Sequence, residues 1–432
     1  MSTGLPLLLL QVVDPQRAPT TGVHVTASII KLLVFFTVYL VTVALLTLAE
    51  RKIAAWIQDR IGPNRVGPGG LLQPAADGVK NFMKEEAQPG GAYGPVFNLA
   101  PALSFIPALA AWAVIPFAAP LPTPWGLIDM IVADIPIGYL FLLAISSLGA
   151  YGLVLAGWSS NNKYALLGGL RGSAQLVSYE IALGMSIIPV LLLAGNVTLT
   201  TIVEQQATSV WNVLSLTLAS IVFLISAFAE TNRLPFDMPE AEAELVAGYH
   251  TEYSSMKFSM FMIAEFAAML TMSGLMATLF FGGWDIPFTL WDNTPPWTVL
   301  KTLVTLLAYG LKTLFFVFTY MWVRWTLPRF RYDQLMALGW RVLLPLMLAY
   351  IVIIAAAVLA LEAAGIRQGV LHGLILFALN LVLLVIVFGW LDRGRLISPS
   401  APRLGAAELA RLRDAARRRH VADRRAVETT GD

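Results

Sequence analysis

The sequence contains no cysteine, so the chain can form neither a disulfide nor a thiolate-ligated iron–sulfur cluster. Its histidines lack the short spacings that are typical of metal ligands; they are His24, His250, His372 and His420. We therefore predict that this chain holds no metal and no cofactor of its own. Any electrons that it uses must arrive on another subunit.

Charge is also scarce. Only 13% of the residues are charged and 57% are hydrophobic, whereas soluble domains are about one-quarter charged. Windows of about 20 apolar residues, long enough to cross the hydrocarbon core, recur along the chain, and no alternating strand pattern appears. We predict an all-α polytopic membrane protein with about nine transmembrane helices, since backbone polar groups in lipid must be satisfied within each segment. The nine windows are residues 27–49, 98–118, 137–157, 176–194, 211–229, 258–281, 298–323, 342–363 and 368–391.

Basic residues, lysine and arginine, are frequent in every second connecting loop and scarce in the loops between. Six lie in residues 50–97 and none in 119–136, and ten follow residue 391. The positive-inside rule then predicts that the N-terminus lies outside and the C-terminus on the cytoplasmic side of the membrane. The basic C-terminal tail and the absence of a recognisable targeting peptide favour a bacterial cytoplasmic membrane. The start "MSTGLPLLLLQVV" lacks a basic region, so we interpret residues 1–26 as an outside segment and not as a signal peptide. Residues 392–432 form a basic cytoplasmic tail suited to anionic lipid or to a partner protein.

The loop after the first window carries an amphipathic pattern. Leu71, Val79, Phe82 and Met83 fall on one helical face and Asp77, Lys80 and Lys84 on the other, which predicts a helix lying along the membrane interface. A simple surface anchor is the alternative. The neighbouring "GPNRVGPGG" lacks the Gly-Lys-Ser/Thr ending of a phosphate loop and is interpreted as a rigid connector.

Ionisable residues inside the apolar windows are costly in lipid and usually face protein or water. Glu180, Glu265 and Lys312 lie within windows, and Glu230 ends the fifth. A structural pair of Glu265 with Lys312 is one interpretation. Proton transfer along a line of carboxylates is the one that we favour, because burial and neighbouring negative charge keep such groups protonated near neutral pH.

The stretch 229–258 reads "AETNRLPFDMPEAEAELVAGYHTEYSSMKF". Its spacing places Glu240 and Glu244 on one helical face and Glu242 elsewhere, an arrangement that does not help an ordinary surface helix. A solvated acidic loop is one reading. The prolines, aromatic residues and basic residues of the stretch instead favour a folded cap. The basic loop 324–341, with Arg324 and Arg329, is expected to be its electrostatic complement.

Five blocks together resemble one family, the H subunits of NADH–quinone oxidoreductase, which are also called subunit 1 of respiratory complex I. The blocks read "AERK", "GPNRVGPGGLLQPAADGVKNFMKE", "GWSSNNKYALLGGLRGSAQLVSYE", "AETNRLPFDMPEAEAELVAGYHTEYSSMKF" and "WVRWTLPRFRYDQLMALGW". They span residues 49–340, and each falls on the predicted cytoplasmic side or just inside it. The first 25 residues and the tail lie outside the resemblance.

The resemblance implies a subunit that joins the membrane arm to the electron-carrying arm and forms much of the quinone chamber, from loops 50–97, 158–175, 230–257 and 324–341. It implies quinone as substrate, FMN and iron–sulfur clusters on partner subunits, and antiporter-like subunits beside this one. Chamber residues would be Glu50, Arg51, Arg60, Asp77, Lys80 and Arg233. Residues of the proton path and its coupling would be Glu180, Glu230, Glu240, Glu242, Glu244, Glu252 and Glu265, to which we add Lys312.

One departure affects the implied proton path. Some bacterial relatives carry a glutamate in the third span where this chain has Ser147, so a water or another carboxylate would have to fill the gap. Two alternatives remain open, a membrane subunit of a hydrogenase-type complex and a purely structural anchor. A stand-alone transporter is disfavoured because no internal repeat is visible. Nucleic acid is not an expected partner, and either ubiquinone or menaquinone is compatible with these residues.

Overall fold

The computed structural model describes residues 21–391, except residues 125, 288 and 367. Residues up to Val387 belong to one compact unit, and a second unit begins at Phe388. The predictions for residues 1–20 and for the basic tail 392–432 lie outside the described residues. The predicted outside segment 1–26 is already helical from Thr21 onward.

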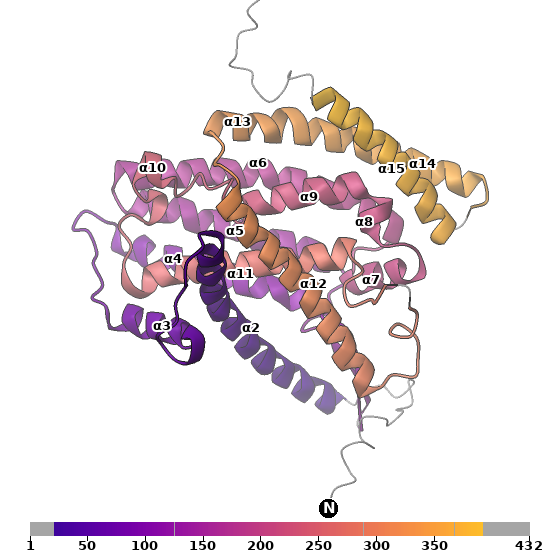
Figure 1. Cartoon of the computed structure of the whole chain (residues 1–432), viewed down its shortest axis with the longest axis horizontal. Helices are drawn as coiled ribbons and strands as arrows, with labels where there is room; N and C mark the ends of the chain where they lie inside the picture. Colours follow the sequence, from indigo (N-terminus) through magenta and orange to yellow (C-terminus); the bar gives the residue numbers. More distant parts are fainter. Residues whose placement is uncertain (1–20, 125, 288, 367, 392–432) are drawn as a thin grey trace, which may run out of the picture. The chain divides into compact units, whose positions relative to one another are not determined.

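Long helices dominate the described residues, and eight of them are long and apolar enough to cross a membrane (Figure 1). This confirms the all-α polytopic fold. The long helices are α2 (Thr21–Ile57), α4 (Gly94–Ala110), α5 (Gly138–Ser159), α6 (Lys163–Ala194), α11 (Ser255–Phe280), α12 (Val299–Thr326), α14 (Leu344–Ala363) and α15 (Val370–Leu391).

The predicted fifth span, residues 211–229, is broken in two. A short turn, α8 (Asn212–Ser215), is followed by α9 (Thr217–Glu230), because Leu216 leaves the helical conformation with φ −132° and ψ 46°. The 14 residues of α9 reach only about 21 Å at 1.5 Å per residue, less than the roughly 30 Å of a hydrocarbon core. A hydropathy window does not register such a break, so the fifth of the nine predicted windows corresponds to a short apolar helix and the other eight to long ones.

Two long helices also extend beyond the predicted spans. α2 continues to Ile57, so Glu50 and Arg51 are helical and do not lie in a loop. α6 begins at Lys163, capped by the Asn162 side chain, which accepts a hydrogen bond from the Tyr164 amide at 2.9 Å. Most of the predicted loop 158–175 is therefore the first part of a helix. Apolar windows mark the lipid-crossing part of a helix and not its ends.

A β-hairpin, β1 (Ala118–Thr123) and β2 (Gly126–Met130), lies between α4 and α5. No strand was expected from the sequence, so the hairpin corrects that expectation. The hairpin is fastened to α12, where the Thr305 hydroxyl accepts from the Ala119 amide at 3.1 Å and the Thr302 hydroxyl donates to the Pro120 carbonyl at 2.9 Å. Short strands of this kind lack a periodic signal because proline and glycine interrupt them.

Shorter elements connect the long helices. The predicted interfacial helix is present as α3 (Gln73–Met83), with Val79, Phe82 and Met83 exposed along one face. The others are η1 (Pro68–Gly70), η2 (Ala111–Val114), α7 (Leu199–Thr208), α10 (Glu242–Leu245), η3 (Gly248–His250), α13 (Tyr332–Ala337) and a π-helical turn η4 (Leu338–Leu343).

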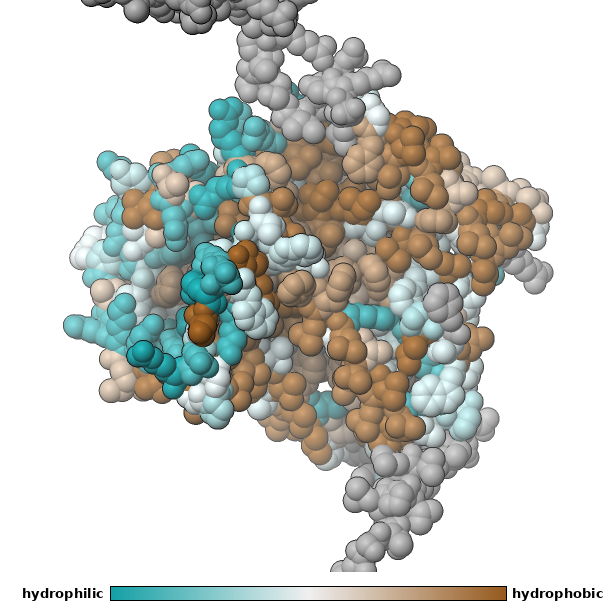
Figure 2. Space-filling model, in the orientation of Figure 1, coloured by the Kyte–Doolittle hydropathy of each residue, from teal (hydrophilic) through white to brown (hydrophobic). Residues whose placement is uncertain are grey.

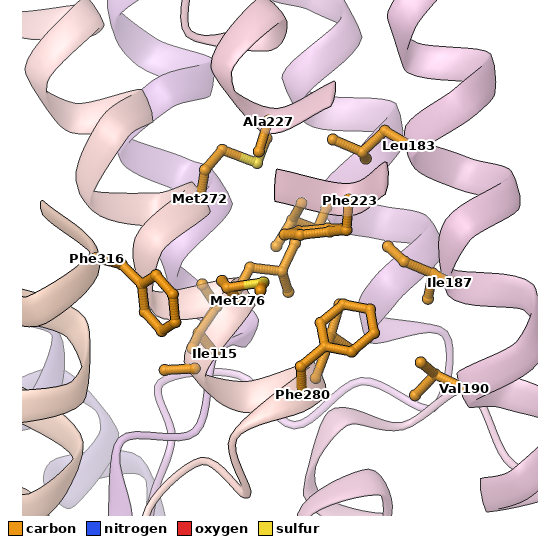
Figure 3. Close-up of a cluster of buried hydrophobic side chains, with 14 of the residues drawn as sticks. Ile115, Leu183, Ile187, Val190, Phe223, Ala227, Met272, Met276, Phe280 and Phe316 are labelled. Carbon is orange, nitrogen blue, oxygen red and sulfur yellow. The ribbon is translucent and has the colours of Figure 1, made fainter. Parts of the chain in front are cut away.

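The core forms where α6, α9 and α11 meet. Leu183 and Ile187 of α6 face Phe223 of α9 and Phe280 of α11, whose rings lie 5.4 Å apart (Figure 3). On the face that Figure 2 shows, hydrophilic residues gather over α3 and α10, whereas hydrophobic residues cover much of α12. On this face, the largest group of hydrophilic residues therefore lies at the end of the molecule that carries α3 and α10.

Gly168 of α6 allows the segment after α9 to pack closely. A Cβ at this position would lie 2.7 Å from the Pro239 carbonyl oxygen and 2.7 Å from the Tyr249 amide nitrogen, both of them backbone atoms that cannot move aside. We predict that Gly168→Ala lowers the free energy of unfolding by about 1–3 kcal/mol, as overpacking does, measured as thermal stability of the detergent-solubilised protein.

Gly184→Ala is the matched control on the same helix. Its nearest neighbour would be a Leu143 methyl group at 3.9 Å, which is ordinary contact, so stability should stay the same or rise slightly. Equal stabilities of the two variants would contradict the packing described here.

Candidate functional site

Four side chains from four separate segments form a buried charge cluster. They are Glu50 of α2, Arg233 just after α9, Glu265 of α11 and Arg324 of α12. Arg233 contacts Glu50 at 3.0 Å and Glu265 at 2.8 Å, and Arg324 contacts Glu50 at 2.5 Å and Glu265 at 3.9 Å. Each cation therefore bridges both carboxylates.

Burial makes this arrangement sensitive to any change of charge. The Arg233 side chain is 0% exposed and that of Glu50 is 8% exposed, and the guanidinium of Arg233 also lies over the Phe266 ring at 4.5 Å. Buried charges are tolerated when they are paired, and removing one partner typically costs about 3–5 kcal/mol because the other is left uncompensated. The cluster is balanced as two cations against two carboxylates.

The acidic segment, residues 231–254 between α9 and α11, is folded and largely buried. This confirms the predicted cap and excludes the solvated-loop reading. Gln175 of α6, which is fully buried, fastens its start: its amide donates to the carbonyls of Ala229 at 2.7 Å and Phe236 at 2.6 Å. Sequence reasoning missed Gln175, since a single glutamine beside an apolar window carries no distinctive pattern.

The basic loop complements the acidic segment as expected. Arg329 donates to the Asp237 carboxylate at 2.9 Å, and the Phe330 amide donates to the Pro235 carbonyl at 3.2 Å. Burial, reinforced by the nearby charge of Glu240 and opposed by Arg329 and Arg324, raises the pKa of Asp237 to about 7. Asp237 was not among the predicted site residues, yet its carboxyl group titrates near neutral pH.

Glu240 pairs with His250, whose Nε2 lies 3.5 Å from the carboxylate. Burial alone would raise the pKa of Glu240, but the hydrogen bond and charge of His250, with Arg324 and Arg233, lower it overall. Burial would likewise lower the pKa of His250, and the hydrogen bond and charge of Glu240 raise it overall. The pair is therefore held in its charged form.

The remaining acidic residues point in different directions. Glu244 pairs with Arg171 at 2.5 Å, Glu252 accepts from Asn162 at 2.6 Å and Glu242 is exposed. Helix α10 begins at Glu242, so Glu240 lies outside it and does not share a helical face with Glu244. That expectation was wrong because Ala241, with φ 29° and ψ 59°, breaks the helix between them.

A cavity of about 100 Å³ adjoins the cluster. Carboxylates from three elements line it, together with small and polar side chains: Glu230, Glu240, Glu265, Ser104, Ser146 and Asn232. One carboxylate oxygen of Glu230, Oε2, is buried and has no hydrogen-bond partner among the described residues. A polar cavity of this size has room for a few ordered waters.

Glu180 of α6 is half-buried and is not among the described residues that line the cavity. Ser147 bonds within its own helix, donating to the Ala144 carbonyl at 3.0 Å. Its neighbour Ser146 faces the cavity instead. Ser147 therefore does not replace the carboxylate that some relatives carry at this position of the implied proton path.

The predicted chamber residues outside the cluster gather between α2 and α3. Arg51 contacts Asp77 at 2.5 Å and Lys80 lies 3.8 Å from the same carboxylate, while Lys52 donates to the Gly69 carbonyl. These contacts fasten the amphipathic helix to the end of α2. Arg60 lies apart from them in the turn after α2, where it donates to Gln58 at 2.7 Å.

Lys312 is not paired with Glu265. Its ammonium donates to the carbonyls of Phe281, Gly283 and Asp285 at 2.7, 3.0 and 2.5 Å. Phe281 follows α11, 16 residues beyond Glu265, or about 24 Å along the helix. The structural pair that we considered between Glu265 and Lys312 is therefore absent, and Lys312 holds the loop after α11.

Other hollows offer less chemistry. A groove of about 860 Å³ between α2, the hairpin and α12 is apolar apart from Lys31 and a few hydroxyls. Within residues 21–391, as far as they are described, no group of three or more His, Asp or Glu side chains could hold a metal ion. The cluster and its cavity remain the candidate site.

The contacts of the acidic segment should depend on pH. A raised pKa of His250 gives stability that is present below its ordinary value of 6.5 and lost as pH rises through the raised value. The raised pKa of Asp237 acts in the same direction: the stability that it contributes is lost as pH rises from the ordinary pKa of 3.8 to the raised pKa of about 7. We predict that hydrogen-exchange protection of residues 236–250, corrected for intrinsic exchange rates, falls as pH rises through neutrality.

The double variant Asp237→Asn, His250→Gln should flatten this dependence. Arg331→Gln is the control, because among the described residues its side chain pairs with Asp333 and makes no ion pair or hydrogen bond to the segment. A wild-type pH profile that survives in the double variant would show that other groups control the segment.

Comparison with known proteins gives consistent matches. Residues 30–355 match the family described as NADH dehydrogenase. The chain is 48% identical over 326 residues to an H subunit of NADH-quinone oxidoreductase from Cytophaga hutchinsonii, covering 75% of this chain and 94% of the relative. It is 50% identical over 326 residues to the corresponding H subunit of Leptospira biflexa, covering 73% and 90%. It is also 50% identical over 332 residues to "NADH-ubiquinone oxidoreductase chain 1" of Chondrus crispus, covering 77% and 97%.

Proposed function

We propose, from the premise that this chain belongs to the NADH dehydrogenase family and is a membrane subunit of an NADH–quinone oxidoreductase, that it couples quinone reduction to proton movement. The observation that carries the proposal is the cavity, which places Glu230, Glu240 and Glu265 together beside the buried charge cluster. Neither a surface anchor nor a lipid-facing helix needs buried carboxylates at such a cost in desolvation.

Quinone would bind outside the cavity and not within it. Small-molecule pockets usually measure about 300–1,000 Å³, several times more than the cavity of about 100 Å³ beside Glu230. We infer that the chamber is built on the end of α2 and α3, with Glu50, Arg51, Arg60, Asp77, Lys80 and Arg233 as its polar side chains. Exposed apolar residues such as Trp56, Ile61 and Phe82 surround this end, and partner subunits would complete the wall.

Reduction of a quinone to a quinol takes two electrons and two protons. The electrons would come from the iron–sulfur subunits of the complex, and FMN would be bound there as well. When the quinone takes up protons beside the cluster, the electrostatic potential at Arg233 and Arg324 changes. Because each arginine bridges Glu50 and Glu265, such a change alters how strongly both carboxylates hold a proton.

This change in electrostatic potential would affect two groups of residues. The Glu240–His250 pair and Asp237 connect it to the acidic segment, with Glu242, Glu244 and Glu252 at the segment's surface. Glu265, Glu230 and Glu180 connect it through the membrane helices toward antiporter-like partner subunits. Lys312 lies far from this group, so its part in a path would be near the C-terminal end of α11, beside the middle of α12.

We propose the orientation that the positive-inside rule predicts, with the N-terminus outside and the chamber on the cytoplasmic side of a bacterial membrane. α3 supports this arrangement, because an amphipathic helix tied to α2 by Arg51 and Asp77 would lie along the cytoplasmic interface.

Glu230→Gln tests the proposal most cleanly. Glu230 makes no ion pair among the described residues, so the substitution removes a proton-carrying group while leaving the charge cluster intact. We predict that the complex assembles in normal amount, but that coupled NADH–quinone turnover falls by about 10²-fold or more, the usual contribution of a positioned acid or base. Turnover and proton pumping are measured in inverted membrane vesicles.

Glu204→Gln, at an exposed position of α7, is the control and should behave as wild type. Full coupled turnover and pumping in Glu230→Gln would remove the carboxylate path and favour a purely structural anchor.

A further inference from the structure

The break between α8 and α9 leaves backbone groups without the partners that a continuous helix would give them. The first amides of a helix have no acceptor within it, and a side-chain oxygen at the N-cap position usually accepts from the second or third of them. Leu216 holds the N-cap position of α9, and its side chain has no such oxygen. Unsatisfied backbone groups are costly inside a membrane, so the start of α9 needs a cap from elsewhere in the protein.

Asn380 of α15 supplies this cap from another helix. Its Oδ1 accepts a hydrogen bond at 3.4 Å from the amide of Leu218, the second residue of α9. Its Nδ2 donates at 2.7 Å to the carbonyl of Ser215, the last residue of α8. A single side-chain amide therefore bonds the backbone on both sides of the break.

The amide of Asn380 is buried and fully bonded. It is 0% exposed, its Oδ1 also accepts from the Tyr350 hydroxyl of α14 at 2.7 Å, and its Nδ2 also donates to the Leu376 carbonyl at 3.0 Å. These four bonds use both donors and both lone pairs of the side chain. A polar group in an apolar helix such as α15 is costly unless it is bonded in this way, which indicates a specific role at the break.

α15 also approaches the break closely. A Cβ at Gly373 would lie 3.0 Å from the Val210 side chain and 3.2 Å from the Ser215 hydroxyl oxygen. Gly373 and Asn380 are two helical turns apart, so they share the face of α15 that docks on the break. α15 lies beyond residues 30–355, which match the family. The cap is therefore a feature of this chain that the family match does not cover.

The other end of α9 carries Glu230 and is fastened as well. Glu230 is the last residue of α9, and Gln175 donates to the neighbouring Ala229 carbonyl at 2.7 Å. Side-chain amides from two other helices, Asn380 and Gln175, thus hold the two ends of α9. The capped residue Leu218 and Glu230 are 12 residues apart, or about 18 Å along the helix, so a displacement at the start of α9 reaches Glu230 at its end.

We propose that Asn380 is a positioning residue, which caps α9 from another helix and thereby fixes the place of Glu230 in the cavity. This rests on the proposed function of the carboxylate path. Proton transfer requires its donor and acceptor within hydrogen-bond reach, directly or through one water. A start of α9 that frays or shifts would move Glu230 away from its proton-transfer partners. Asn380 itself carries no proton.

The test replaces Asn380 by leucine, which has a similar size but forms no hydrogen bonds, in the assembled complex. Asn380→Leu should speed hydrogen exchange of the amides of residues 216–221 about five- to tenfold, as the loss of an N-cap does. It should lower the kcat of coupled NADH–quinone turnover about tenfold or more through misplacement of Glu230. The KM for quinone should stay the same, because the end of α2 and α3 is not altered. A merely structural role would lower the amount of complex without producing this split between kcat and KM.

Thr302→Val is the matched control. Thr302 is 2% exposed, and its hydroxyl bonds the Pro120 carbonyl of the hairpin and the Thr298 carbonyl of its own helix. The variant therefore loses a buried hydrogen bond between a long helix and its neighbour, but no bond to α9. Exchange at residues 216–221 and kcat should both equal those of wild type.

Gly373→Val tests the same contact if Asn380→Leu does not assemble. The larger side chain forces α15 away from Val210 and Ser215 but keeps every hydrogen-bonding group of the cap. It should produce the same rise in exchange and the same fall in kcat.

The outcomes separate this inference from the function on which it rests. Unchanged exchange at residues 216–221 in Asn380→Leu would show that the cap is not formed. If exchange rises while turnover and pumping stay as in wild type, and Glu230→Gln stalls, then Asn380 does not position Glu230 and the carboxylate path stands. If Glu230→Gln is itself fully active, the path fails and the positioning role fails with it. An equal loss of kcat in Thr302→Val would assign the effect to loosened packing, which also overturns the inference.

Discussion

The pairing of Arg233 and Arg324 with Glu50 and Glu265 is the interaction on which the rest of the structure depends. These four groups come from α2, the start of the acidic segment, α11 and α12, so they join elements that are far apart in sequence. Arginine suits the position because its fixed fork of donors can hold two carboxylates at once. Lysine would be a poor replacement, since a compact ammonium group cannot reproduce both contacts.

The acidic segment next to the cluster has an unusual backbone conformation. Asn232, Ala241 and Val246 have φ values of 52°, 29° and 68°, which residues other than glycine rarely adopt. Strain of this kind persists only where the surroundings enforce it, and here Gln175, Arg329 and the Glu240–His250 pair do so. A segment that is strained, buried and fastened by titratable groups is suited to respond when a nearby charge changes.

The sequence predicted those features that depend on the distribution of apolar and charged residues along the chain. The long apolar helices, the amphipathic helix at residues 73–83 and the buried carboxylates Glu180, Glu230 and Glu265 all follow from hydropathy and from the cost of charge in lipid. The break at Leu216 and the β-hairpin did not, because local backbone conformation decides them and neither leaves a periodic signal. The blocks of family resemblance located the acidic segment correctly, although they did not predict its pairings.

The missed functional residues share one physical cause. Gln175 and Asp237 are ordinary residues in sequence, and their importance arises only from what lies beside them after folding. Lys312 shows the converse, because its position within a span suggested a partner on the neighbouring helix. Three backbone carbonyls satisfy it instead. An ionisable residue in lipid needs a partner, but the sequence does not say which one.

The central claim is that quinone reduction changes the protonation of carboxyl groups beside the charge cluster. Redox-difference infrared spectroscopy of the purified complex measures this directly, since a protonated carboxyl group has its own C=O stretching band. We expect reduction of the bound quinone to change such a band, and Glu265→Gln to remove that change while the bands of the quinone itself persist. An identical carboxyl difference spectrum in wild type and in Glu265→Gln would contradict the account.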